Sequence, residues 1–180
     1  MAGTACGNGS AERPSTSQTE RTDTPVDATS SFHGDQAGGF SLSYPGSWSE
    51  QEPATGLIVV AVFAPESTID EGFRPNINVV VEPLNVDMDS EAYADANISL
   101  VSGSFEGFEE LDRGTTTIDR EPAIWIEYTA LFQDQTVKQR QAYFTRGRNG
   151  FVITYSATED SFEDQLSAAS LVEASFSLDR

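Results

Sequence analysis

The sequence predicts an α+β fold in which an antiparallel sheet is covered on both faces. Between residues 121 and 157, three stretches rich in β-branched and aromatic residues alternate with a period of two, and short polar turns separate them. Apolar residues occupy both faces of these stretches, which is typical of strands covered on both sides. Two further stretches, 90–102 and 160–173, show helical spacing of apolar residues.

The three-stranded meander between residues 121 and 157 has two predicted turns. Residues 133–135 form a loop of hairpin length, and 146–150 supply two glycines and an asparagine for a tight turn. The alternation predicts two groups of side chains, with Trp125, Tyr143 and Ile153 on one face and Ile126 and Phe144 on the other.

Four strands are predicted before the meander. The first, 40–44, alternates and ends at a Pro-Gly pair, whereas 57–63 is a continuous apolar run, as in a central strand. The third covers 76–82 and ends at a proline, and the fourth covers 108–118. They extend the predicted sheet beyond the meander.

The two predicted helices carry recognisable ends. Asp89 is an N-cap residue for the helix over 90–102, and Gly103 is a stop signal. Asp160 and Glu163 lie near the positive N-terminal end of the second helix, 160–173. A short strand over 174–178 is expected to close the chain.

The composition is strongly acidic. Asp and Glu outnumber Lys and Arg by 29 to 10, which gives a net charge of −19 and a pI near 4.1. Nucleic acids and anionic membrane surfaces are therefore excluded as partners. Lys138 is the only lysine. Such a surface is typical of proteins from halophiles, and a high-GC genome, which favours arginine over lysine, is the alternative explanation.

The N-terminal part is predicted to be a tether rather than a folded unit. Small residues lead to Cys6, the only cysteine, as at the end of a lipobox, although Gly3 stands where leucine is usual. We interpret 1–6 as a residual lipobox-like segment with Cys6 as lipid anchor. Residues 7–38 are polar and rich in Ser and Thr, so we expect a disordered linker before a domain over 39–180.

A resemblance to a known superfamily covers roughly residues 39 to 178. The residues that carry it are Phe40, Tyr44, Pro45, Trp48, Gly114, the strand Ala123 to Tyr128, the strand Phe151 to Tyr155, Phe162, Ser175 and Phe176. In this pattern the chain resembles the superfamily that includes PsbP, the bacterial DcrB-like lipoproteins and a nuclear-import factor that binds Ran.

The resemblance implies a three-layer α/β/α sandwich around one mostly antiparallel sheet of six to seven strands. It also implies a non-catalytic protein, because members mostly dock on larger assemblies or lie as lipoproteins on the outer face of a membrane. No catalytic residue set is carried over, and no cofactor or metal is expected. The metal ligands of some photosystem members often include histidine, whereas His33 is the only histidine here and lies in the predicted linker.

One basic cluster is the candidate binding site. It comprises Lys138, Arg140, Arg146 and Arg148, four of the ten positive charges of the chain. Guanidinium groups on a rigid hairpin suit a carboxylate, a phosphate or an acidic protein surface. The alternative is that these side chains pair with carboxylates on neighbouring strands, such as Glu127.

Other candidate chemistry is weak. The acidic run 85–91 has the alternating oxygens of a calcium loop, but Ser90 stands where the loop needs glycine, so helix-capping acids are the better interpretation. Carboxylate pairs among 106–112 could serve a hydrolase, yet an acidic chain forms such pairs by chance. The aromatics Trp48, Trp125, Tyr128, Tyr143 and Tyr155 could line a ligand cleft or pack in the core.

The sequence thus favours a non-catalytic, extracytoplasmic lipoprotein domain that binds a protein partner or a membrane-associated assembly. It would contact the membrane only through its lipid anchor, and we expect a monomer. A small-molecule or metal-ion binding protein with its site beside the meander is the first alternative, and a hydrolase is the second.

Overall fold

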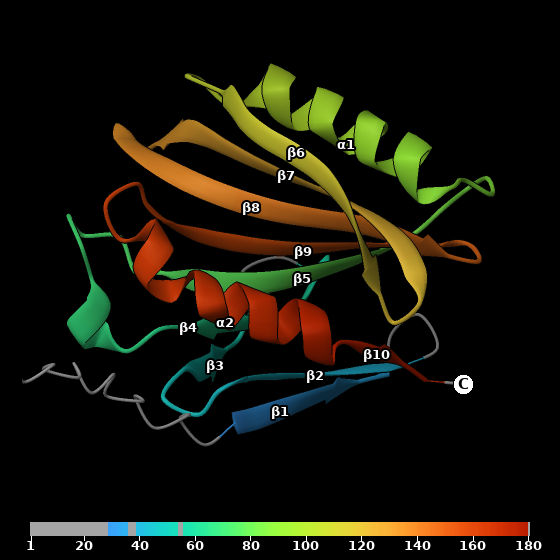
Figure 1. Cartoon of the computed structure of the whole chain (residues 1–180), viewed down its shortest axis with the longest axis horizontal. Coiled ribbons are helices and arrows are strands. Elements are labelled where there is room, and N and C mark those ends of the chain that lie inside the picture. The colour runs from blue at the N-terminus through green and yellow to red at the C-terminus, as the bar shows by residue number, and fades with distance from the viewer. Residues whose placement is uncertain (1–28, 36–38, 54–55, 180) are drawn as a thin grey trace, which may run out of the picture.

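The computed structural model describes residues 29–35, 39–53 and 56–179 (Figure 1). Its helices and strands follow one another in the order β1 (Thr29–Gly34), β2 (Phe40–Pro45), β3 (Ser49–Gln51), β4 (Ile58–Phe63), β5 (Asn76–Pro83), α1 (Ser90–Ser104), β6 (Glu109–Ile118), β7 (Glu121–Phe132), β8 (Gln135–Arg146), β9 (Asn149–Thr158), α2 (Phe162–Ser175) and β10 (Ser177–Leu178). A 3-10 turn, η2 (Glu66–Thr68), follows β4. Residues 1–6 with Cys6, and residues 7–28 of the predicted linker, lie outside the described ranges.

The strands form two sheets, in which every pair is antiparallel. The larger sheet has seven strands in the order β3-β4-β5-β9-β8-β7-β6, and the smaller one has the order β1-β2-β10. Helix α1 packs on one face of the larger sheet and α2 on the other, with the small sheet beside α2 (Figure 1). The predicted α+β sandwich is confirmed. The sequence did not predict the small sheet. Strand β2 does not join the larger sheet, and it buries Phe40, Leu42 and Tyr44 on the side of α2.

Strand β1 corrects the predicted linker. Thr29–Gly34 pair along β2, with Phe32 opposite Leu42, and the Phe32 ring lies 5.6 Å from that of Phe40. The stretch is poor in apolar residues, so it is held as a strand by backbone pairing to β2 rather than by burial of its own side chains. The fold therefore begins at least ten residues before the expected boundary at residue 39.

The meander forms as predicted, but its two faces are assigned wrongly for one strand. Trp125 is paired with Ala142, and Ala142 with Ile153, whereas Tyr143 is paired with Ile124 on the opposite face. The reason is the length of the first turn. It contains two residues, Gln133 and Asp134, both at positive φ, whereas the sequence predicted a loop of three residues. A shift of one residue moves every side chain of a strand to the other face.

Two apolar cores result. The larger lies between the seven-stranded sheet, α2 and the small sheet, and it includes stacked Phe144 and Phe151 rings with centroids 4.8 Å apart. The smaller lies under α1, where Tyr93 and Ile98 meet Ile126 from β7. As predicted, Asp89 caps α1 by accepting a hydrogen bond from the Ala92 backbone N–H at 2.8 Å. Because α1 is the only described helix on its face, part of that face has no helical cover.

Candidate functional site

The predicted basic cluster is divided between two places. Lys138 and Arg140 point from β8 toward α2, and both lie within 3.3 Å of Glu127 on β7. Lys138 also reaches Glu163 of α2 at 3.3 Å, and Arg140 reaches Glu173 at 3.0 Å. These two cations therefore join the sheet to α2 through shared carboxylates.

Aromatic rings complete the surroundings of this pair. The Lys138 ammonium lies 4.0 Å from the centroid of the Phe162 ring, and the Arg140 guanidinium lies 4.3 Å from that of Trp125. Both cationic side chains are only 16–17% exposed. These contacts with carboxylates and aromatic rings occupy both positive charges within the protein. Lys138 and Arg140 therefore agree with the alternative interpretation of the sequence, in which they pair with carboxylates on neighbouring elements.

Arg146 and Arg148 lie apart from that network, at the turn between β8 and β9. Arg146 is 3.9 Å from both Asp119 and Glu121, and Arg148 is 4.0 Å from Asp87. Their side chains are 40% and 62% exposed, so these long ion pairs are solvent-screened and weak. Of the predicted cluster, these two arginines retain charge at the surface.

A cleft beside α1 combines apolar and polar side chains on the described surface. It has a volume of about 340 Å³ and lies where α1, which packs on β7 and β8, leaves the same face of β9 and β5 without a helix. The residues that line it are Leu57, Asn78, Val80, Glu82, Asn97, Val101, Phe105, Phe132, Gln139, Gln141, Tyr143, Val152 and Thr154. Apolar walls with a few convergent polar groups are typical of ligand sites.

The floor of the cleft is a set of polar side chains that already bond to one another. Tyr143 donates its hydroxyl hydrogen to the side-chain oxygen Oε1 of Gln141, and the side-chain nitrogen Nε2 of Gln141 donates to Thr154 Oγ1 at 3.1 Å. The neighbouring row repeats this pattern, because Tyr128 donates to Gln139, whose amide donates to a serine of β9 at 2.9 Å. Since each amide uses one N–H and keeps a second, the floor is both ordered and able to bond a ligand.

The two ends of the cleft differ in chemistry. At the end near the β8–β9 turn, Glu82 accepts a hydrogen bond of 2.7 Å from the Tyr93 hydroxyl. At the other end, the rings of Phe105 and Phe132 lie with centroids 4.8 Å apart. The cleft therefore runs from a carboxylate to an aromatic pair.

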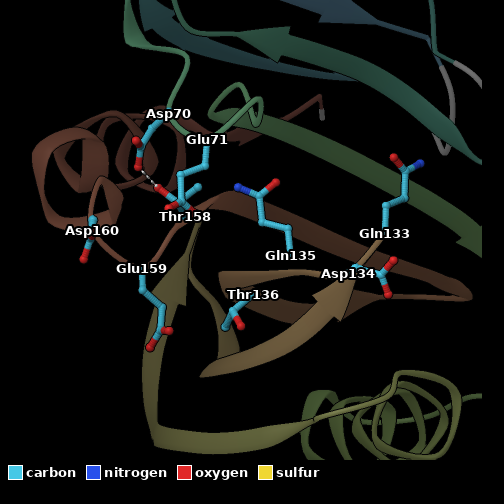
Figure 2. Close-up of a pocket in the computed structure, with 9 residues that line it drawn as sticks. All are labelled: Asp70, Glu71, Gln133, Asp134, Gln135, Thr136, Thr158, Glu159 and Asp160. Carbon is cyan, nitrogen blue, oxygen red and sulfur yellow. Dashed lines mark hydrogen bonds between the residues drawn. The ribbon is translucent and has the colours of Figure 1, made fainter.

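A second, larger cavity is acidic. Its volume is about 550 Å³, and its lining includes the carboxylates of Asp70, Glu71, Asp134, Glu159 and Asp160. Figure 2 shows Asp70 and Asp134 on opposite sides of this cavity, with Asp70 engaged by the Thr158 hydroxyl. Within the described ranges, no three His, Cys, Asp or Glu side chains are placed to hold one metal ion, so this cavity is not a formed metal site.

A family model described as DcrB matches residues 40–174 of this chain. The chain belongs to the DcrB family. This confirms the resemblance stated from the sequence and places the matched core from β2 to α2, with the cleft inside it. A search of the curated proteins finds no match.

Solved structures share the fold of this DcrB-family chain. PsbP of the cyanobacterium Synechocystis (CyanoP) is 15% identical with a TM-score of 0.61, over 87% of this chain and 96% of that one. LpqN of Mycobacterium tuberculosis, which is involved in cell envelope biogenesis, is 16% identical with a TM-score of 0.57, over 84% of this chain and 85% of that one. The Ran-binding protein Mog1p of Saccharomyces cerevisiae is 12% identical with a TM-score of 0.58, over 84% and 96%.

The histidine assigned to the predicted linker lies in the small sheet of this DcrB-family chain. His33 lies in β1, 3.6 Å from Asp35 and 3.5 Å from Asp179, and it is 57% exposed. It is therefore not set in a rigid buried site. No helix in the described part is long and apolar enough to cross a membrane.

The sequence did not single out the cleft. Of the aromatic residues suggested as cleft-lining, only Tyr143 reaches it, while Trp48, Trp125, Tyr128 and Tyr155 are core residues. The sequence feature that could have indicated the cleft is the alternation of Gln139, Gln141 and Tyr143 in a central strand. Amides on a buried face need partners, and that requirement indicates a polar row across the sheet.

Burial under α1 changes the titration of the tyrosines in the cleft floor. Burial raises the pKa of Tyr143 above its ordinary value near 10, and the neighbouring Tyr128 hydroxyl raises it further. Above about pH 10 the unfolded chain loses this proton while the folded chain keeps it, so stability falls as the pH rises. We expect each such tyrosine to remove about 1 kcal/mol of the free energy of unfolding between about pH 10 and about pH 11.

Urea unfolding of the natural chain and of Tyr143→Phe across this pH range tests that expectation. The variant lacks the titrating hydroxyl, so its loss of stability with pH should be smaller by about 1 kcal/mol. Equal losses for both proteins would show that the Tyr143 hydroxyl titrates normally in the folded state.

Proposed function

We propose that this DcrB-family chain is a non-catalytic binding domain whose ligand site is the cleft beside α1. The observation that carries the proposal is the combination of an ordered polar floor, apolar walls and one carboxylate in a single concavity. Among the described residues that line the cleft there is no cysteine and no histidine.

We further propose that the domain acts outside the cytoplasm, on a tether. Cys6 would carry the lipid anchor, and the polar residues up to β1 would space the domain from the membrane. LpqN, which shares this fold, is involved in cell envelope biogenesis, and this supports the proposed location.

Binding of a protein partner is the second candidate function. The exposed Arg146 and Arg148 at the β8–β9 turn favour it, because they present positive charge on a domain that is otherwise acidic. The structurally similar Mog1p is a Ran-binding protein, so this fold is compatible with recognition of a protein. The net charge of −19 excludes a nucleic-acid partner in either case.

A variant that fills the cleft tests the first candidate. Val101 lines the cleft, whereas the adjacent Leu100 of α1 is 68% exposed. Compounds that raise the thermal midpoint of the natural chain should lose that effect with Val101→Trp and keep it with Leu100→Trp. A midpoint shift that survives Val101→Trp, or a broad panel in which no compound shifts the midpoint, would contradict ligand binding in the cleft.

A further inference from the structure

The charge of the cleft indicates which ligands it can take, given the proposed function above. Glu82 is the only charged residue among those that line it. No described lysine or arginine lies within 4.0 Å of the Glu82 carboxylate, although eight ion pairs of lysine or arginine form elsewhere in the described part of the chain. Its one described hydrogen bond comes from the neutral Tyr93 hydroxyl. The negative charge in the cleft is therefore not neutralised by the fold.

Glu82 lies at one end of the cleft. It is paired with Gly150 on β9, beside the β8–β9 turn, and Tyr93, the fourth residue of α1, donates a hydrogen bond to it. Phe105, at the C-terminal end of α1, lines the opposite end. The twelve residue steps from Tyr93 to Phe105 correspond to roughly 18 Å of helix, so the cleft, with a volume of about 340 Å³, is elongated along α1.

The cleft changes in character along this length. Val80, Val101 and Val152 provide apolar walls along it, over a floor whose amides and hydroxyls bond to one another. Phe105 and Phe132 enclose its far end. A ligand that matches these surroundings has one charged end and a slender apolar body. The chain's net charge of −19 attracts cations to the site and repels anions.

We infer that the cleft binds an unbranched amphiphile with a cationic ammonium head. The ammonium group lies at Glu82, where it donates hydrogen bonds to the carboxylate, and the hydrocarbon chain extends beside α1 toward Phe105 and Phe132. A charge-assisted bond at Glu82 selects ammonium over carboxylate ligands. Burial of the chain strengthens binding about fourfold for each methylene that leaves water.

Calorimetric titration of the full chain with three ligands of one chain length tests this inference. The ligands are decylamine, which is an ammonium ion at neutral pH, decanol and decanoate, each kept below its micelle concentration. We expect decylammonium to bind at least tenfold more tightly than decanoate. Glu82→Gln should weaken decylammonium binding at least tenfold and leave decanol binding unchanged.

Two further variants control for binding elsewhere on an acidic surface. Glu109→Gln removes the same charge from an exposed position on β6 and should leave all three affinities unchanged. Val101→Trp should abolish binding of both decylammonium and decanol because it fills the cleft.

Each outcome decides between the two proposals. If decanoate binds as tightly as decylammonium, or if Glu82→Gln has no effect on decylammonium, the cationic class is refuted. If, in that case, decanol binds to the natural chain and this binding is lost with Val101→Trp, the cleft remains supported as a ligand site. Decylammonium binding that survives Val101→Trp would show adsorption to surface carboxylates and overturn the inference.

Discussion

Gly150→Val is expected to lower the free energy of unfolding by about 3 kcal/mol. A Cβ at Gly150 would lie 2.4 Å from Cζ of Tyr93 and 2.7 Å from its hydroxyl oxygen. Tyr93 cannot easily move aside, because it is 2% exposed and its hydroxyl is bonded to Glu82. The added side chain must therefore lift α1 or displace the tyrosine, and urea unfolding followed by circular dichroism measures the cost.

Two companion variants separate this steric effect from a general effect on glycine. Gly103→Ala adds a methyl group that meets no atom within 4 Å, and it should stabilise α1 by up to about 1 kcal/mol. Tyr93→Leu in the Gly150→Val background removes the ring that clashes, so the double variant should lose less than the sum of the two single losses. Additive losses would show that Gly150 and Tyr93 are not coupled.

Arg140→Ala is expected to cost about 3 kcal/mol of unfolding free energy. The guanidinium group bonds Glu173 of α2 at 3.0 Å and Glu127 of β7 at 3.3 Å, and it covers the Trp125 ring. Removing it leaves Glu173 without an ion-pair partner among the described residues and leaves Glu127 with Lys138 alone, and both carboxylates are mostly buried. Equilibrium urea unfolding should show this loss together with weaker protection of α2 from hydrogen exchange.

Arg148→Ala is the matched control for Arg140→Ala. Arg148 is 62% exposed, its nearest carboxylate is 4.0 Å away, and it donates one exposed hydrogen bond to the Asn85 carbonyl, so its removal should change stability by less than about 1 kcal/mol. Arg140→Lys should recover only part of the loss, because a lysine lacks the planar fork that bonds Glu173 and Glu127 together. Full recovery by lysine would show that charge alone matters at this position.

Local signals in the sequence were sufficient for most elements of the larger sheet and for both helices. The alternation in β7 and β9 and the Asp89 cap of α1 each depend on neighbouring residues, and each appears in the structure. The family resemblance, carried by core aromatics such as Phe40 and Phe162, was confirmed by the family match. These features could be predicted because burial and capping act over a few residues of chain.

The features that could not be predicted depend on distant partners. β1 forms a strand because its backbone pairs with that of β2, and β2 lies in a small sheet because of its contacts with α2. The face of Tyr143 depended on whether a turn contains two residues or three. The cleft combines Glu82 with Phe105 and Phe132, which no local pattern brings together.

The unequal cover of the two faces has a consequence for motion. On one face, α2 is held by the larger core, the small sheet and ion pairs from Glu163 and Glu173. On the other face, α1 is held by the smaller core, by the Asp95–Arg113 ion pair and by the Tyr93–Glu82 hydrogen bond. Segments with fewer buried contacts open locally at a lower free energy than the whole domain. Detachment of α1 from its smaller core therefore requires less free energy than detachment of α2, and it exposes Gln141 and Thr154 while the α2 side stays closed. The rate at which a molecule reaches the cleft is then governed by the fluctuation of one helix, and a bound molecule that bridges α1 and β5 slows that fluctuation.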